Sequence, residues 1–257
     1  MTPLRQTWQV TLRYLRVIAR QPAFVGIGLV QPIIWLLLFG ALFKAVTQIP
    51  GFQGGSYIDF LTPGVVVMLA VSSAGWTGMG FIDDIDSGVM DRMLAAPVWR
   101  GALNLGSVLQ SVIQILIQTL LIVLLALALG AHYENGVGGV LVLMLVAALL
   151  GAAFASLSNG LAVLTRQRES LIGAVTLVLL PLTFLSSALM QQSLAPDWIG
   201  TVARFNPVNW AVEAGRTAAF EPIDWGLVAG RVGLLGALVV VAGSLATRAF
   251  STYQRSL

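Results

Sequence analysis

The sequence predicts an all-α, polytopic membrane protein with six transmembrane helices. Three observations support this fold class: 57% of the 257 residues are hydrophobic, only 10% are charged, and the mean hydropathy is +0.88. Soluble domains usually carry about 25% charged residues. A helix needs about 20 apolar residues to cross a bilayer, and six stretches meet that length, at about residues 23–46, 58–82, 104–130, 138–164, 170–190 and 226–247.

Residues 1–22, before the first span, predict an amphipathic helix on the cytoplasmic membrane surface. Apolar side chains recur there at spacings of three and four, at Leu4, Trp8, Leu12, Leu15 and Ile18. We expect this helix to lie flat in the interface with its arginines toward lipid phosphates. The alternative is a basic flank that is helical without that role. The apolar run that follows exceeds the roughly 7 to 15 residues of a cleaved signal peptide's core, so we expect it to remain as an anchor.

The basic residues predict the orientation of the chain. An even number of spans places both termini on one side, and ten of the fourteen Lys and Arg residues fall in segments that share that side: Arg5, Arg13, Arg16, Arg20, Arg92, Arg100, Arg166, Arg168, Arg248 and Arg255. The positive-inside rule makes this side cytoplasmic. The strong preference for arginine over lysine, with many Ala, Gly and Val, indicates a bacterial origin, and therefore the bacterial plasma membrane.

Residues 191–225, between the fifth and sixth spans, are too polar to cross the membrane. They contain three prolines, which break helices, and three tryptophans, which favour the headgroup boundary: Pro196, Pro207, Pro222, Trp198, Trp210 and Trp225. We expect one or two short re-entrant helices in the outer leaflet. An ordinary extracellular loop is the alternative.

Several kinds of chemistry are excluded or disfavoured. The chain has no cysteine and one histidine, which excludes disulfides, thiolate metal sites and histidine clusters. A Walker-type phosphate loop is missing, because the sole lysine, Lys44, lies in the first apolar run. Ion-coupling carboxylates are missing from the span centres. Four aspartates near residues 83–91 could hold magnesium in a membrane phosphotransferase, but such enzymes need a second acidic set. We therefore expect no enzymatic activity, no metal and no cofactor on this chain.

The stretch SGVMDRMLAAPVWRGALNLGS, residues 87–107, lies in the cytoplasmic loop 83–103 between the second and third spans. It resembles the loop of ABC-2 type transporter permeases, with a glycine, an acid, a leucine, a small-residue-proline pair, an arginine and a later glycine at Gly88, Asp91, Leu94, Ala96-Pro97, Arg100 and Gly106. Ser107 stands where that family often has lysine.

A second block, residues 184–216, is similar to the signature of the same family between its last two spans. The matching positions are Pro196, Trp198, Asn206-Pro207, Glu213 and Arg216. Ala188 replaces the usual glycine, and a glutamine replaces the usual proline near residue 191. Among subfamilies the chain looks most like the daunorubicin-resistance permeases.

The resemblance implies a permease subunit of an ATP-driven exporter that moves a hydrophobic or amphipathic compound outward. It also implies a homodimer, or a pair with a related permease chain, and a separate ATPase subunit that carries ATP and Mg; nucleic acid has no role. An ATP-independent channel or ion-coupled carrier is the alternative.

In that assignment the loop is the coupling helix. Gly88 and Pro97 would bracket about two helical turns, with Asp91 and Arg92 offering charges to the ATPase and Met93, Leu94 and Trp99 as apolar anchors; Arg100 completes the set. A solvated turn between spans is the alternative.

Polar residues on the third and fifth spans are candidates for a translocation path. Ser107, Gln110, Ser111, Gln114 and Gln118 share one helix face, and Thr176 and Thr183 give the fifth span a mildly polar side. The glutamines either line the path or join the third span to a neighbouring helix. At the outer side we expect a gate at Trp198, Asn206, Pro207, Glu213 and Arg216, in which Glu213 and Arg216 form an ion pair.

Overall fold

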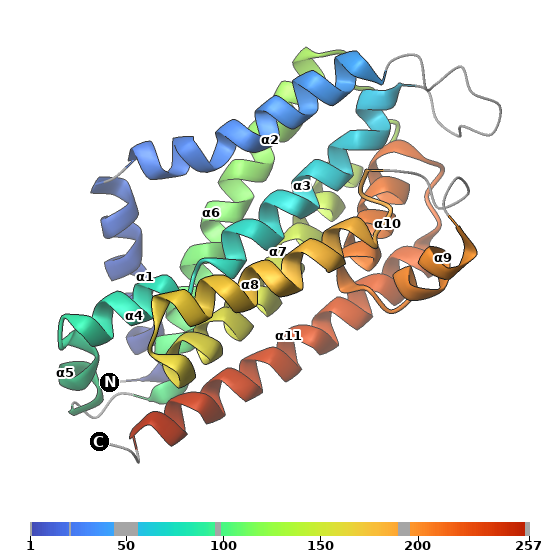
Figure 1. Ribbon diagram of the computed structural model, residues 1–257. Coiled ribbons are helices and arrows are strands. Elements are labelled where there is room, and N and C mark those ends of the chain that lie inside the picture. The colour runs from blue at the N-terminus through green and yellow to red at the C-terminus, as the bar shows by residue number, and fades with distance from the viewer. Residues whose placement is uncertain (1, 21, 44–55, 96–98, 190–195, 255–257) are drawn as a thin grey trace.

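The computed structural model describes residues 2–20, 22–43, 56–95, 99–189 and 196–254 (Figure 1). These residues form helices and no strand, as the composition predicts. The helices are α1 (Pro3–Arg20), α2 (Pro22–Leu42), α3 (Tyr57–Gly75), α4 (Met79–Asp86), α5 (Val89–Ala95), α6 (Arg100–Ala128), α7 (Gly136–Thr165), α8 (Arg168–Phe184), α9 (Asp197–Ala203), α10 (Pro207–Phe220) and α11 (Trp225–Gln254).

Each predicted span overlaps an apolar helix: α2, α3, α6, α7, α8 and α11 in chain order. Four helical stretches are long and apolar enough to cross a membrane, namely Tyr57–Asp86, Gly101–Ala128, Gly136–Thr165 and Trp225–Ser251. Gly26–Leu42 is apolar but shorter, and α8 has 17 residues. The six-span topology therefore stays a prediction.

Helix α7 lies at the centre of the bundle and packs against α3, α6, α10 and α11. Its small residues permit this close approach. A Cβ added to Gly139 would lie 2.2 Å from the carbonyl oxygen of Ala218 in α10, and one added to Gly160 would lie 3.2 Å from Cα of Ala246 in α11. The core around α7 includes Val66, Ile115, Leu143, Leu150 and Val212.

The predicted span 58–82 is not one regular helix, because a turn at residues 76–78 separates α3 from α4. Ser158 of α7 stabilises this turn. Its hydroxyl donates to the carbonyl oxygen of Gly75 over 2.5 Å and accepts from the amide of Gly78 over 3.0 Å. The side chain thus satisfies backbone groups that a helix break would leave unpaired inside the bundle.

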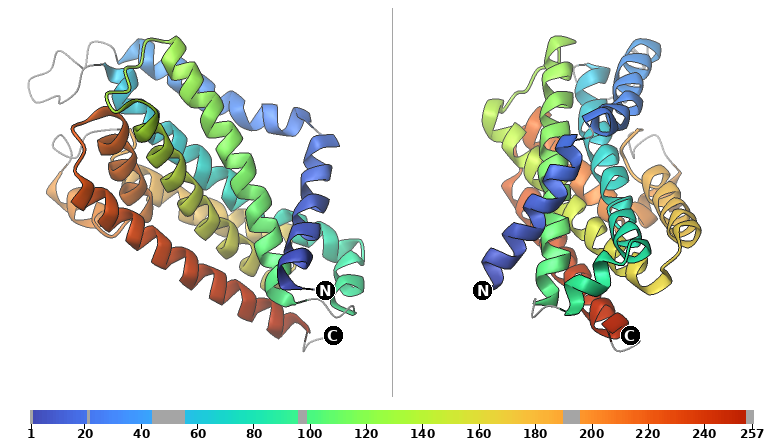
Figure 2. Two further views of the ribbon diagram at one scale, coloured as in Figure 1. Left: turned by 180° about the vertical axis from the view of Figure 1, so that it is seen from behind. Right: turned by 90° about the vertical axis from the view of Figure 1, so that its left-hand side faces the viewer.

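The charged and polar connecting segments gather at opposite ends of the bundle. Figure 1 shows both termini together with α4 and α5 at one end, and α9 and α10 at the other. The reverse view in Figure 2 shows α1 at the first end, against the beginning of α6. The arrangement agrees with the prediction that the arginine-bearing segments share one face.

Candidate functional site

The predicted coupling loop forms two short helices, α4 and α5, joined by a tight turn. Gly88 in this turn has a φ of +68°, in the left-handed region that favours glycine. The Ser87 hydroxyl donates to the carbonyl oxygen of Asp83 over 2.7 Å, and Arg92 Nε donates to the carbonyl oxygen of Gly88 over 3.2 Å. Helix α5 therefore occupies the interval predicted between Gly88 and Pro97, although Pro97 itself lies outside the described residues.

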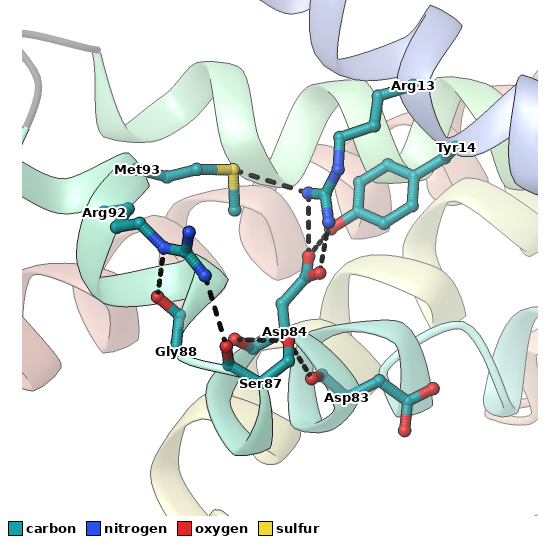
Figure 3. Close-up of polar contacts among 8 residues, drawn as sticks. All are labelled: Arg13, Tyr14, Asp83, Asp84, Ser87, Gly88, Arg92 and Met93. Atoms are coloured by element: carbon teal, nitrogen blue, oxygen red, sulfur yellow. Dashed lines mark hydrogen bonds and ion pairs between the residues drawn. The ribbon is translucent and has the colours of Figure 1, made fainter.

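Helix α1 holds this hairpin through Asp84 of α4 (Figure 3). Both terminal nitrogens of Arg13 contact the Asp84 carboxylate, with Nη1 2.9 Å from Oδ2 and Nη2 bonded to Oδ1. The Tyr14 hydroxyl donates to the same Oδ2 over 2.7 Å. Arg13 Nη1 also lies 3.4 Å from the sulfur of Met93 in α5, so one guanidinium contacts both helices of the hairpin.

The Arg13–Asp84 contact is largely removed from water. Asp84 is 6% exposed, and the Arg13 side chain is 36% exposed. The hydrogen bond with Asp84 raises the pKa of Arg13. Burial, and then the charge of Asp84, raise the pKa of Tyr14 well above its ordinary value. Both α1 side chains are therefore protonated donors to an acceptor carboxylate at neutral pH.

The neighbouring aspartates face another basic residue. Arg168, at the start of α8, lies 2.5 Å from Asp83 and 3.3 Å from Asp86. These pairs are exposed and each contributes little to stability. Among the described residues no group of three or more acidic or histidine side chains could hold a metal ion. The aspartates whose side chains are described are paired with arginines of α1 and α8.

Two more contacts attach α1 to the beginning of α6. Gln6 Oε1 accepts from the backbone amide of Trp99 over 3.0 Å, and the buried Thr11 hydroxyl lies 3.2 Å from the carbonyl oxygen of Gly106. A Cβ added to Gly106 would lie 2.6 Å from Val10, so glycine is what allows α1 to approach. Helix α1 thus contacts both the beginning and the end of the loop 83–103. Arg13 bonds Asp84, so the expectation that this arginine faces lipid phosphates is wrong.

The remaining coupling residues lie on or beside the same hairpin. Arg92 and Trp99 are exposed, and Met93 is half-buried beneath Arg13. Asp91 and Leu94 belong to α5, and Arg100 begins α6. The structure therefore brings together every described member of the predicted set, and it adds Gln6, Arg13, Tyr14 and Arg168, which the sequence reasoning missed.

The polar stripe of α6 bonds partly to neighbouring segments and partly within its own helix. Ser107 donates to Asn159 of α7 over 3.5 Å, and Ser111 accepts from Thr77 over 3.0 Å. Gln110 donates to Gln114 over 3.1 Å. Gln114 and Gln118 line a cavity. Hydroxyls at one end of the stripe join α6 to neighbouring segments, and glutamines farther along line a cavity. A role of these glutamines in a translocation path stays a prediction.

The cavity lies between α2, α3 and α6 and has a volume of about 230 Å³. Gln118 accepts from Ser73 of α3 over 3.0 Å, and α2 contributes Gln31 and Trp35 to the lining. Thr176 is exposed and Thr183 half-buried, both on α8, which contributes no described residue to this cavity. The structure does not bring these threonines together with the glutamines.

The predicted outer gate forms a set of helix-anchoring contacts. Asn206 caps α10, and Pro207 occupies the first turn of that helix. The side-chain amide of Asn206 donates to the carbonyl oxygens of Leu182 over 2.6 Å and Leu185 over 2.9 Å. Trp198 on α9 is 60% exposed. The described part of the segment thus contains two short helices, and α10 is fixed to the end of α8. Their re-entrant position in the outer leaflet stays a prediction.

The predicted Glu213–Arg216 ion pair is replaced by other partners. Glu213 lies 2.7 Å from Arg231 of α11. Arg216 donates to the carbonyl oxygens of Phe60 over 3.2 Å and Ser187 over 2.8 Å, and its guanidinium stacks 3.9 Å from the centre of the Phe60 ring. Spacing along one helix suggested the pair, but packing gave each side chain a partner from another segment: α11 for Glu213, and α3 and the segment after α8 for Arg216.

These features define a class: a polytopic, all-helical membrane protein with a charged helical hairpin at one end and short amphipathic helices at the other. The chain belongs to the ABC-2 type transporter family, which it matches over residues 5–220. This agrees with the resemblance of the two sequence blocks. The family consists of transport permeases, so its membrane helices serve transport.

Curated relatives include proteins of drug resistance. The chain is 32% identical over 190 residues to the daunorubicin resistance ABC transporter permease protein DrrB1 of Streptomyces coeruleorubidus, covering 72% of this chain and 65% of that protein. It is 29% identical over 201 residues to the putative transport permease ycf38 of Porphyra purpurea, covering 77% and 68%. It is 25% identical over 211 residues to the probable doxorubicin resistance permease protein DrrC of Mycobacterium tuberculosis (strain ATCC 25618 / H37Rv), covering 82% and 75%.

Proposed function

We propose that this chain is the membrane-spanning permease subunit of an ATP-driven exporter in a bacterial plasma membrane. A separate ATPase subunit would carry ATP and Mg, and two permease chains would form the transport unit. Six spans place both termini and the α4–α5 hairpin on the cytoplasmic side. Support comes from the family, from the drug-resistance relatives and from the gathering of arginine-bearing segments at one end of the bundle.

The observation that carries this proposal is the way the α4–α5 hairpin is held. Arg13 and Tyr14 bind it from α1, and Arg168 binds it from the start of α8. Arg92 remains exposed on α5. A partner that pushes on α5 would therefore move α1 and α8 together with α4. An element that has a buried bond to α1, exposed ion pairs to α8 and an exposed face suits the transmission of ATPase closure to the spans.

The cargo in this proposal is a hydrophobic or amphipathic compound. Two relatives are named for resistance to daunorubicin or doxorubicin, and the α6 cavity combines glutamine amides with tryptophan rings. Such a surface accepts molecules that have both an apolar body and a few polar atoms.

Co-purification from native membranes in mild detergent tests the proposal. We expect mass spectrometry to find a subunit with a phosphate loop in stoichiometric amount. The double reversal Asp91→Lys with Arg92→Glu should release it. The matched control combines Asp197→Lys at the start of α9 with Arg204→Glu just beyond its end, both exposed at the opposite end of the bundle, and should retain the ATPase subunit. A chain that purifies alone under conditions that preserve known complexes would contradict the proposal and favour a channel or ion-coupled carrier.

A further inference from the structure

Helix α8 is attached firmly at its two ends and packs loosely between them. All 17 residues of α8 are described, and two of them, Leu171 and Val175, are buried. Farther along the helix, Leu177 is 75% exposed and Phe184 is 62% exposed. Among the described residues, the hydrogen bonds that join α8 itself to another segment lie at its first residue and at Leu182. The middle of α8 is therefore held by apolar contacts.

The first end of α8 is joined to the α4–α5 hairpin. Arg168 forms ion pairs with two aspartates of α4. Leu171 and Val175 belong to a buried apolar cluster that also contains Phe81 of α4 and Met90 of α5. Burial of apolar side chains stabilises such a joint more than exposed ion pairs do. The beginning of α8 and the hairpin thus share one core.

The other end of α8 is joined to α10 by polar side chains. Asn206 donates to the carbonyl oxygen of Leu182. The backbone amide of Ser187 donates to Oδ1 of Asn209 over 2.9 Å, and the carbonyl oxygen of Ser187 accepts from Arg216 over 2.8 Å. Both asparagines are buried. The last backbone groups of a helix lack partners within that helix, and here α10 supplies partners to this end of α8.

We propose that α8 mechanically couples the α4–α5 hairpin to α10, at the opposite end of the bundle. Figure 1 shows α8 running from the α4 end to the α10 end, and its 17 residues span about 25 Å. Pro181 falls in the last turn, so most of the helix is uninterrupted. Apolar contacts are non-directional, so a shift of α8 breaks no hydrogen bond along its middle.

This inference rests on the proposed function in one respect, namely that in an exporter α8 would carry motion of the hairpin to the outer segment. It also assigns a role to Asn209, which the sequence reasoning missed. Asn209 is a positioning residue, because its side chain holds the backbone that follows α8.

Hydrogen exchange of the purified chain in lipid nanodiscs tests the coupling without any ATPase. The reporter is the Ser187 amide, followed by mass spectrometry of peptides that contain it. Leu171→Ala weakens the joint at the first end of α8 and should speed exchange at Ser187 at least about fivefold, the lower range of coupling between sites. Leu103→Ala is the matched control, because Leu103 is equally buried in the same cluster but lies on α6. It should leave exchange at Ser187 unchanged.

A milder pair of variants covers the case in which Leu171→Ala does not fold. Arg168→Gln removes the exposed ion pairs to α4 and should speed exchange at Ser187 about twofold. Glu169→Gln, next along α8 and exposed, is its control and should change nothing. The proposal is overturned if the two leucine variants act equally at Ser187, or if Arg168→Gln acts no more than Glu169→Gln.

Coupling between two sites is reciprocal, so a change at the α10 end must reach the hairpin. Asn209→Ala should speed exchange of the α4 amides at least about fivefold. Asn135→Ala is the matched control, because Asn135 also anchors α10, through the carbonyl oxygens of Ala218 and Glu221, and does not bond the end of α8. Equal effects of the two asparagine variants on α4, or no effect of Asn209→Ala, would overturn the proposal.

The two proposals fail separately. Coupled exchange at the two ends of α8, in a chain that never co-purifies with an ATPase, would keep the mechanical coupling and remove the exporter assignment. A chain that co-purifies with its ATPase, yet whose two ends exchange independently, would keep the exporter and remove the role of α8.

Discussion

The guanidinium of Arg13 in α1 contacts both carboxylate oxygens of Asp84 in α4, although the two residues are 71 positions apart in the sequence. The carboxylate is buried, and Tyr14 gives it a further hydrogen bond. Helix α1 and the α4–α5 hairpin are therefore joined as one unit. In a permease driven from outside the chain, such a unit spreads a local push over several helices.

Arg13→Ala should destabilise the protein and disturb coupling. The substitution leaves the carboxylate of Asp84 buried with the Tyr14 hydroxyl as its remaining side-chain donor, and breaking a buried pair costs up to about 3–5 kcal/mol. Because the Arg13 side chain is 36% exposed, we expect about 2 kcal/mol. Thermal unfolding in detergent measures this loss of stability.

Arg16→Ala is the matched control for that measurement. Arg16 lies on the same helix and is exposed, and surface substitutions usually change stability by less than about 0.5 kcal/mol. Equal losses for the two variants would show that the Arg13–Asp84 contact carries no special weight.

The raised pKa of Tyr14 predicts a loss of stability in alkaline solution. Burial and the charge of Asp84 hold the pKa of Tyr14 well above its ordinary value of 10.0, so folding disfavours the phenolate. A group whose pKa is raised by folding contributes stability that is fully present below its unfolded pKa and is lost as the pH rises toward the folded pKa. The loss should begin near pH 10.

Unfolding curves of the unaltered chain and Tyr14→Phe between about pH 8 and 11 measure this loss. The variant should be less stable by about 1 kcal/mol at the lower pH, because the hydrogen bond to Asp84 is gone. Above pH 10 the two curves should converge. Parallel curves over the whole range would assign the alkaline loss to other groups.

Much of the fold follows from the sequence because its signals are local. Long apolar runs give the long helices, and Pro196, Pro207 and Pro222 divide the more polar stretch after α8 into the short helices α9 and α10. Gly88 gives a turn because its left-handed φ suits glycine. Asn206 followed by Pro207 gives a helix start through a side-chain cap. Each of these features depends on a few neighbouring residues.

The partners of charged side chains could not be predicted, because they depend on which helices pack together. An arginine on an amphipathic helix suits lipid phosphate as well as a carboxylate from a distant helix, and Arg13 found the carboxylate. Glu213 and Arg216 have the spacing of an ion pair, yet Glu213 pairs with Arg231 of α11. The break after Gly75 likewise depends on Ser158 from another helix. A single sequence contains no signal for these contacts.

Gly88→Val should weaken coupling while leaving the rest of the bundle intact. A Cβ at this position would contact nothing within 4 Å, so the cost is confined to the backbone conformation at a φ of +68°. That conformation costs a non-glycine residue roughly 1–2 kcal/mol. We expect lower transport-linked ATPase activity with normal membrane insertion.

Gly88→Asn separates backbone strain from the mere presence of a side chain. Asparagine adopts the left-handed region more readily than other non-glycine residues, and should retain most of the activity. If valine and asparagine behave alike, the turn conformation is not what matters at this position.

Arg216→Lys should destabilise the anchoring of α10 although it keeps the positive charge. The guanidinium of Arg216 bonds the carbonyl oxygens of Phe60 and Ser187 and stacks on the Phe60 ring. A lysine ammonium is a point charge on a flexible stem and cannot reproduce a planar fork that stacks. At least one buried carbonyl would lose its partner, at a cost of about 1–3 kcal/mol.

Arg204→Lys is the matched control for Arg216→Lys, because Arg204 is exposed beyond the end of α9 and only its backbone carbonyl, which accepts from Trp210 over 2.7 Å, has a described role. Thermal unfolding should show a clear loss for Arg216→Lys and nearly none for Arg204→Lys. If Arg216→Ala lowers the thermal stability and Arg216→Lys does not, the positive charge alone anchors α10. In that case the contacts to Phe60 and Ser187 would be a consequence of the packing and would not hold the helix in place.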